Sequence, residues 1–97
     1  MTFSFSPEAE TEFLEAIEFL ERQEIGLGIE LSREVFATIH RIILNPEAWP
    51  TYTAGTRRCL TNKFPFGIIY QVVDTQIIIW AVAHLSREPA YWSERLN

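Results

Sequence analysis

The hydrophobic pattern of this chain changes its period near the middle, and that change restricts the fold more than any other feature. Between Ala9 and Leu44 the apolar residues recur every three or four positions, which is the spacing of helices with one buried face. From Arg57 onward the chain consists of short runs rich in β-branched and aromatic residues, which is typical of strands. Because neither kind of apolar surface is stable in water, the helices must pack on the sheet.

The strand-forming half limits how its strands can be connected. Three strands are predicted, at residues 57–64, 67–73 and 77–85. The links Phe64-Pro65-Phe66-Gly67 and Asp74-Thr75-Gln76 are too short for crossover connections, so these strands must run antiparallel. The remaining residues, 86–97, are predicted to form a short helix or an extended tail.

The first half predicts a short strand and two helices. Residues 2–6 alternate polar and apolar side chains, as a strand does. Ser6-Pro7 then supplies an N-cap and a first-turn proline. The first helix would bury Ala9, Phe13, Ala16, Ile17 and Leu20.

The second helix is predicted to run from about Ile29 to Leu44, after a tight link at Gly26 and Gly28 and before Asn45-Pro46, which ends it. Its buried face would contain Val35, Phe36, Ile39, Ile42 and Ile43. The predicted fold is therefore α+β, in the order β-α-α-β-β-β, with a helical hairpin packed on a small antiparallel sheet. Residues 1–97 would form a single domain.

Charge is unevenly distributed along the chain. Residues 1–50 carry ten acids and three bases, a sum of −7, whereas residues 51–97 carry three acids and five bases, a sum of +2. The total of −5 argues against strong direct binding of nucleic acid, which requires a basic field. A small basic patch in the second half remains compatible with these numbers.

Cysteine usage and the apolar runs exclude several other classes of protein. The one cysteine, Cys59, permits no internal disulfide and no cysteine metal cluster, and we expect neither a metal nor a cofactor. The N-terminus lacks the features of a signal peptide. The longest apolar run, residues 77–83, is far shorter than the roughly 20 residues that span a bilayer, so we expect no membrane association and a cytoplasmic location.

The second half also resembles a known family at many positions in order. It reads Arg57-Arg58-x-Leu60, then Phe64-Pro65-Phe66-x-Ile68-x-Tyr70, then Ile79-x-Ala81-x-Ala83-His84-x-x-Arg87-x-Pro89-x-Tyr91-Trp92-x-x-Arg95. This series resembles the ParE-like branch of the RelE/ParE toxins of type II toxin–antitoxin systems. Phe5-x-Pro7-x-Ala9 and Asn45-Pro46 agree with the family in the first half.

The resemblance implies both a fold and a function. The family's fold is a helical hairpin on a small sheet, and its members are cytoplasmic toxins, some serving plasmid stabilisation, that a cognate antitoxin neutralises. ParE-like members inhibit DNA gyrase and have no accepted catalytic residues. We therefore expect a gyrase inhibitor rather than an enzyme. The alternatives are a RelE-like, ribosome-dependent mRNA endonuclease and a non-toxic remnant that still binds antitoxin.

The endonuclease alternative would use two residues near the C-terminus. Arg87 could stabilise phosphorane charge, and Tyr91 could position or deprotonate a 2′-hydroxyl. The structural interpretation, which we favour, is that both residues hold the C-terminal tail in place. His84, predicted on a face shared with Trp80 and Val82, is either an acid–base group or a hydrogen-bonding anchor for the same tail.

The other candidate binding residues are arginines and tryptophans. Arg57 and Arg58 must point to opposite faces of their strand, and if Leu60 faces the core, Arg57 is the one available to a partner. Trp92 is predicted to be partly exposed and able to anchor an interface, and Arg95 completes the set. The antitoxin is expected to lay a basic segment along the acidic helical hairpin or to extend the sheet edge.

Overall fold

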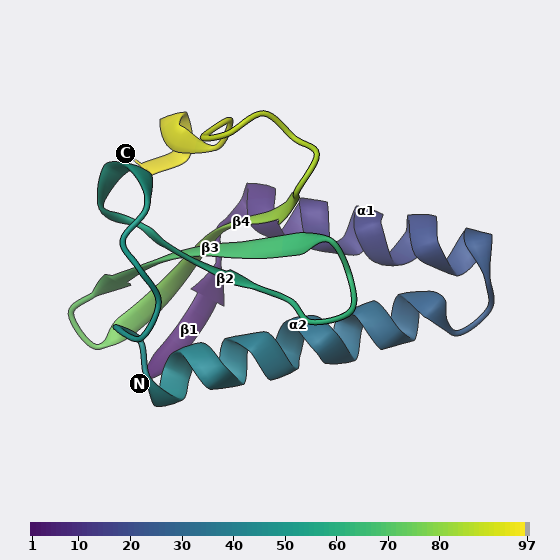
Figure 1. The fold of residues 1–97 in the computed structure, drawn as a ribbon, viewed down its shortest axis with the longest axis horizontal. Coiled ribbons are helices and arrows are strands. Elements are labelled where there is room, and N and C mark those ends of the chain that lie inside the picture. The colour runs from purple at the N-terminus through teal and green to yellow at the C-terminus, as the bar shows by residue number, and fades with distance from the viewer. Residues whose placement is uncertain (97) are drawn as a thin grey trace.

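The computed structural model describes residues 1–96; Asn97, the last residue of the predicted tail, lies outside them. The elements follow in the order β1 (Thr2–Phe5), α1 (Pro7–Gln23), α2 (Leu27–Leu44), β2 (Arg57–Leu60), β3 (Phe66–Val73) and β4 (Gln76–His84). Short 3₁₀ turns lie at Thr53–Gly55 and Ser93–Leu96. The helical hairpin covers one face of the sheet and the C-terminal tail crosses the other, which confirms the predicted α+β class (Figure 1).

The ends of the helices lie where local chemistry predicted them, with one exception. The Ser6 hydroxyl accepts a hydrogen bond from the Ala9 N–H at 3.1 Å and so caps α1, and α2 ends at Asn45. However, α2 begins two residues earlier than predicted and includes Gly28. A Cβ on Gly28 would lie 2.5 Å from the Ile17 carbonyl oxygen, so this glycine allows close helix packing instead of breaking the helix.

The buried face of α2 differs from the prediction at Phe36, whose side chain is exposed. Leu31 and Thr38 are fully buried instead. The Phe36 ring still makes edge contacts with Phe5 and Phe13, at centroid separations of 6.5 and 5.6 Å. Phe36 thus lies at the margin of the core, where two helices and β1 meet.

The sheet has the strand order β1-β4-β3-β2. The pairs β2–β3 and β3–β4 are antiparallel, as their short links required. However, β1 pairs with β4 in parallel, so the sheet is mixed. Parallel pairing needs a long connection, which the chain between β1 and the later strands, including the helical hairpin, provides.

A β-bulge in β4 determines which residues of that strand reach each of the two core clusters, which lie on opposite faces of the sheet. Ile69 pairs with Ala81 whereas Tyr70 pairs with Ile79, which leaves Trp80 as the extra residue. An extra residue reverses the alternation of side chains. Val82 consequently joins the core beneath the helices, where Ile79 also lies, while Ala81 joins a second cluster on the opposite face. The prediction that Trp80 and Val82 lie on the same face is therefore wrong.

Within residues 1–96 no helix combines the length and the apolar character needed to cross a membrane.

Cys59 is 1% exposed, as expected of a small buried side chain, and burial raises the pKa of its thiol despite the nearby charge of Arg41.

Candidate functional site

The face of the sheet opposite the helices is partly covered by the C-terminal tail. Trp92 is 2% exposed and packs on Ile69 of β3 and on Ala81 and Ala83, which follow the bulge in β4. The prediction that Trp92 is partly exposed is therefore wrong. The residue holds the tail to the sheet and is not available as a surface anchor.

One carboxylate on α1 fixes the tail in place. Glu12 Oε2 accepts hydrogen bonds from the Tyr91 hydroxyl at 2.6 Å and from Arg95 Nη2 at 3.0 Å. Its Oε1 accepts from Arg95 Nη1 at 3.1 Å and from the Val82 N–H, beside the bulge, at 3.0 Å. Arg95 Nη1 also donates to the Trp80 carbonyl at 3.0 Å. The tail, α1 and the bulge are thus joined in a single network around Glu12.

This network determines the state of Tyr91. Burial, with the hydrogen bond and the charge of Glu12, raises the pKa of the Tyr91 hydroxyl well above its ordinary value, although Arg87 and Arg95 oppose the shift. The hydroxyl is therefore neutral near physiological pH and donates to Glu12. Arg87 is exposed, with its Cζ 3.8 Å from the centroid of the Tyr91 ring.

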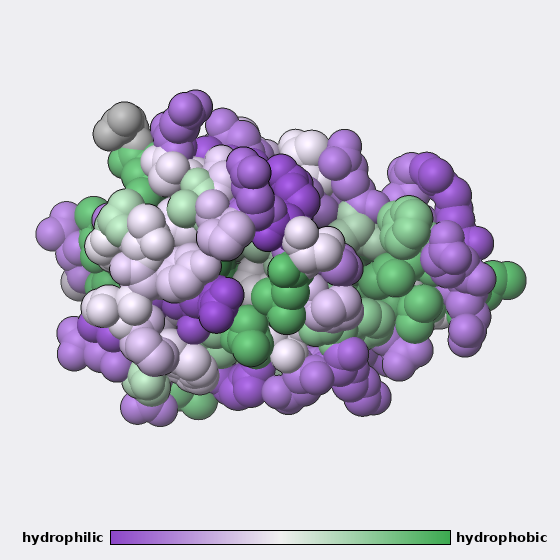
Figure 2. All heavy atoms as spheres, turned by 45° about the horizontal axis from the view of Figure 1, so that its top comes forward, coloured by the Kyte–Doolittle hydropathy of each residue, from purple (hydrophilic) through white to green (hydrophobic). Residues whose placement is uncertain are grey.

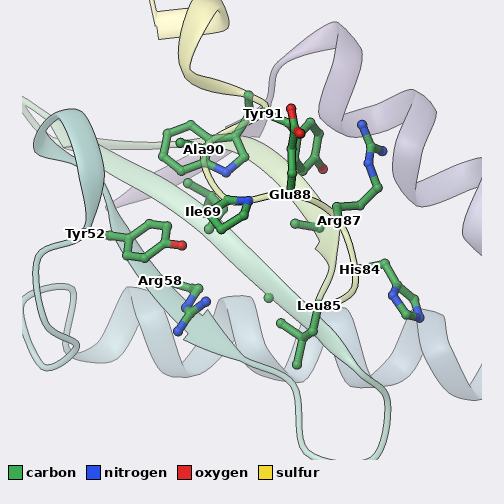
Figure 3. Close-up of a pocket in the computed structure, with 13 residues that line it drawn as sticks. Tyr52, Arg58, Ile69, His84, Leu85, Arg87, Glu88, Ala90 and Tyr91 are labelled. Atoms are coloured by element: carbon green, nitrogen blue, oxygen red, sulfur yellow. The ribbon is translucent and has the colours of Figure 1, made fainter.

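Beside the tail, on the face of the sheet opposite the helices (the open face), lies a small hollow, called the open-face hollow below. Figure 3 shows Tyr52 and Arg58 on one side of it, and Arg87, Glu88 and Tyr91 on the other. The Cζ of Arg58 lies 4.7 Å from the centroid of the Tyr52 ring. The hollow is also lined by Gly67, Ile69, Ala83, His84, Leu85, Pro89, Ala90 and Trp92.

The structure reverses the faces predicted for the two strand arginines. Cys59 is buried and Leu60 is 45% exposed, so Arg57 lies on the helix side and Arg58 on the open face. Arg57 Nη1 donates to the Trp49 carbonyl at 2.6 Å and thereby fixes the loop before β2. The prediction that Arg57 is the arginine available to a partner is therefore wrong, because Cys59 and not Leu60 is the core residue of β2.

His84 stands at the end of β4 and is exposed. Its Nδ1 accepts a hydrogen bond from the Ser86 N–H at 3.1 Å, and its ring packs edge-on against Phe66 at 5.2 Å. In Figure 3 the ring points away from the centre of the hollow. These contacts match the structural interpretation, in which His84 anchors the start of the tail.

The sequence analysis did not single out Glu12. The signal was present, since Glu12 follows Ala9 by three positions and precedes Ala16 by four, which places it beside the apolar stripe. Tyr52 was also missed, because its contact with Arg58 depends on the path of a loop that has no periodicity. Among residues 1–96 no cluster of three or more metal-ligating side chains occurs.

Comparison with known proteins identifies a family from the sequence and a similar fold among solved structures. Residues 3–89 match the model of the ParE toxin of the type II toxin–antitoxin system parDE. A solved structure described as a chromosomal ParDE toxin–antitoxin system from P. aeruginosa is similar in fold, with a TM-score of 0.77 and 12% identity over 89% of this chain and 97% of that one. No match was found among curated proteins. Since the family model covers most of the sequence, the chain belongs to the ParE toxin family of type II toxin–antitoxin systems.

Proposed function

We propose that this toxin arrests growth in the cytoplasm by binding and inhibiting DNA gyrase, without catalysis of its own. The observation that carries this choice is the state of Tyr91. Its hydroxyl donates to Glu12 at 2.6 Å, and its pKa is raised well above the ordinary value. A tyrosine that deprotonates a 2′-hydroxyl needs a free and readily ionised oxygen. Tyr91 meets neither condition, which supports action by binding over RNA cleavage.

The open face supplies side chains suited to a protein interface. Arg58 and Arg87 are exposed, and neither makes an ion pair within residues 1–96. Tyr52 and Tyr91 lie under their guanidinium groups. Arginine and tyrosine are the residue types that most often carry binding energy at interfaces. We therefore assign target binding to this face.

The antitoxin is proposed to bind the helical hairpin or the outer edge of β1. Residues 7–44 contain nine glutamates and three arginines, a sum of −6, which favours a basic partner segment. Figure 2 shows apolar side chains among hydrophilic ones towards the end of the molecule where the two helices join. The exposed apolar side chains on the hairpin are Leu14, Phe19, Ile25, Ile29, Phe36 and Leu44. An amphipathic basic helix from the antitoxin would cover such a surface.

The test is inducible expression in a bacterial host without the antitoxin gene, with DNA damage response and transcript integrity read together. Growth arrest with a damage response and intact transcripts is the expected result. The Tyr91→Phe variant keeps the ring beneath Arg87 and loses only the hydroxyl, so it should retain activity if it folds. Transcripts cut at codon positions, with loss of cutting in Tyr91→Phe, would instead identify the endonuclease. Harmless expression of a folded chain would identify the non-toxic remnant.

A further inference from the structure

The open-face hollow contains two arginines whose positions are fixed by aromatic rings. Arg87 lies on Tyr91, whose hydroxyl is held by Glu12, and Arg58 lies on Tyr52. The Tyr52 ring is itself packed against buried Trp92, at a centroid separation of 5.9 Å. Within residues 1–96 neither guanidinium donates a hydrogen bond to another side chain or carbonyl. Their donors therefore remain available to a ligand.

Small residues form part of the floor between these arginines. Gly67 and Ala83 are paired directly across β3 and β4, and both line the hollow. A Cβ on Gly67 would lie 3.4 Å from Cγ and Cδ of Arg58. Because Gly67 has no side chain, the stem of Arg58 can lie close to the sheet.

Two exposed leucines lie at the hollow or beside it. Leu60 is 45% exposed and Leu85 is 47% exposed, and Leu85 lines the hollow. A second depression, which shares Tyr52 and Arg58 with the first, includes Leu60 and Trp49. The two depressions thus form one continuous surface in which arginines alternate with apolar and aromatic side chains. This composition is typical of the centre of a protein interface.

The charge around the hollow favours a short acidic ligand over a long polyanion. Arg58 and Arg87 outnumber Glu88, which gives the lining a formal charge of +1 when His84 is neutral. A nucleic-acid strand carries a phosphate at every nucleotide, and the lining supplies only two arginines to neutralise them. A short protein segment with a few carboxylates matches that supply, and guanidinium groups bind carboxylates through two parallel hydrogen bonds.

We propose that the open-face hollow binds an acidic, partly apolar, extended segment of a protein partner, with carboxylates on Arg58 and Arg87 and an apolar side chain against Leu85. This inference rests on the proposed function in one respect, since it takes the partner to be the toxin's target. The recognised chemistry is defined independently of that partner's identity.

The experiment titrates the purified full chain, labelled with ¹⁵N, and follows the Nε–H resonances of its arginines by NMR. Three probes are compared: a blocked peptide alternating glutamate with leucine, its glutamine counterpart, and single-stranded oligo(U) of equal length. The glutamate peptide should shift Arg58 and Arg87 while leaving Arg33 unchanged, and the glutamine peptide should not. Shifts with oligo(U) alone would overturn the proposal in favour of RNA, and absence of any shift at both arginines would also overturn it.

A matched pair of charge reversals provides the second arm. The double substitution Arg58→Glu with Arg87→Glu should lower the affinity for the glutamate peptide at least about tenfold, because two charge-assisted contacts become repulsive. Arg22→Glu with Arg33→Glu makes the same change in net charge on the helical layer and should leave the affinity within about twofold. Equal losses in both variants would refute a localised site.

The peptide titration and the gyrase assay can fail separately. If the toxin binds the glutamate peptide but does not inhibit gyrase, the proposed binding site is supported and gyrase is refuted as the target. If the chain does not bind the peptide and the variant Arg58→Glu with Arg87→Glu still inhibits gyrase, gyrase is supported as the target and the proposed binding site is refuted.

Discussion

Replacing Glu12 with alanine should release the C-terminal tail and destabilise the whole domain. The carboxylate accepts four hydrogen bonds, including two from Arg95, and the side chains of Glu12 and Arg95 are 15% and 18% exposed. Removing one partner of a buried ion pair costs about 3–5 kcal/mol. Residual exposure reduces that cost, so we expect a loss of roughly 3 kcal/mol, which corresponds to a fall in Tm of roughly 12–24 °C for a domain of this size.

Urea denaturation followed by circular dichroism would measure the global loss, and hydrogen exchange would locate it. The N–H groups of Ser93 and Arg95 donate within the tail, to the carbonyls of Ala90 and Trp92, and should exchange faster in the variant. Glu15→Ala is the matched control, because Glu15 is exposed on the same helix, and its effect should stay within about 0.5 kcal/mol.

A double substitution separates the role of the charge from that of packing. Glu12→Leu combined with Arg95→Met removes both charges and should recover much of the lost stability, since apolar pairs often replace buried ion pairs without cost. If Glu12→Ala changed stability by less than about 0.5 kcal/mol and left tail exchange unaltered, the argument that this carboxylate holds the tail would be refuted.

Three further substitutions test other parts of the fold. Gly28→Ala should destabilise the chain by about 1–3 kcal/mol in urea denaturation, because the new Cβ would lie 2.5 Å from the Ile17 carbonyl oxygen; a stabilised variant would contradict the close packing. Ser6→Ala should cost about 1 kcal/mol by the same measurement through loss of the α1 cap, and no change would exclude that role. Burial raises the pKa of Tyr70, whose hydroxyl donates to the Pro46 carbonyl at 2.6 Å, to about 12. The hydroxyl of Tyr70 therefore loses its proton at a lower pH in the unfolded chain than in the folded one. The stabilisation that this hydroxyl provides is complete below about pH 10 and is lost as the pH rises towards 12. Tyrosinate absorbance should show the late titration, and Tyr70→Phe should remove this part of the alkaline loss of stability.

Local chemistry was sufficient to predict the helices and hairpins. Ser6 and Asn45 mark helix ends because capping depends on neighbouring residues, and the antiparallel pairs follow from links too short for any other connection. The parallel pairing of β1 with β4 was not predictable in this way. It joins Phe3 to Ile77 across the intervening helices, so no local pattern specifies it.

The candidate site was harder to predict because side chains alternate between the two faces of a strand, so an error of one residue exchanges the faces. One extra residue at Trp80 exchanges the faces of everything that follows in β4. In β2 the assignment turned on whether Cys59 or Leu60 is buried, and the bulkier residue proved to be the exposed one. Thus the residue types at the site were visible in the sequence, but the faces on which they lie were set by packing over long distances.

The division of charge between the two layers bears on how one small domain could serve two partners. The helical layer contains nine of the thirteen acids, while Arg58 and Arg87 lie on the opposite face of the sheet beside the tail. Under the proposed roles, a basic antitoxin segment would be attracted to the first surface and repelled by the second, and an acidic target segment would behave in the opposite way. The same domain could therefore direct the two partners to different faces without specific contacts at long range. Because screening at physiological salt acts over about 8 Å, each surface would respond mainly to its own charges. Charge reversal on one face should consequently impair one association while leaving the other near its original strength.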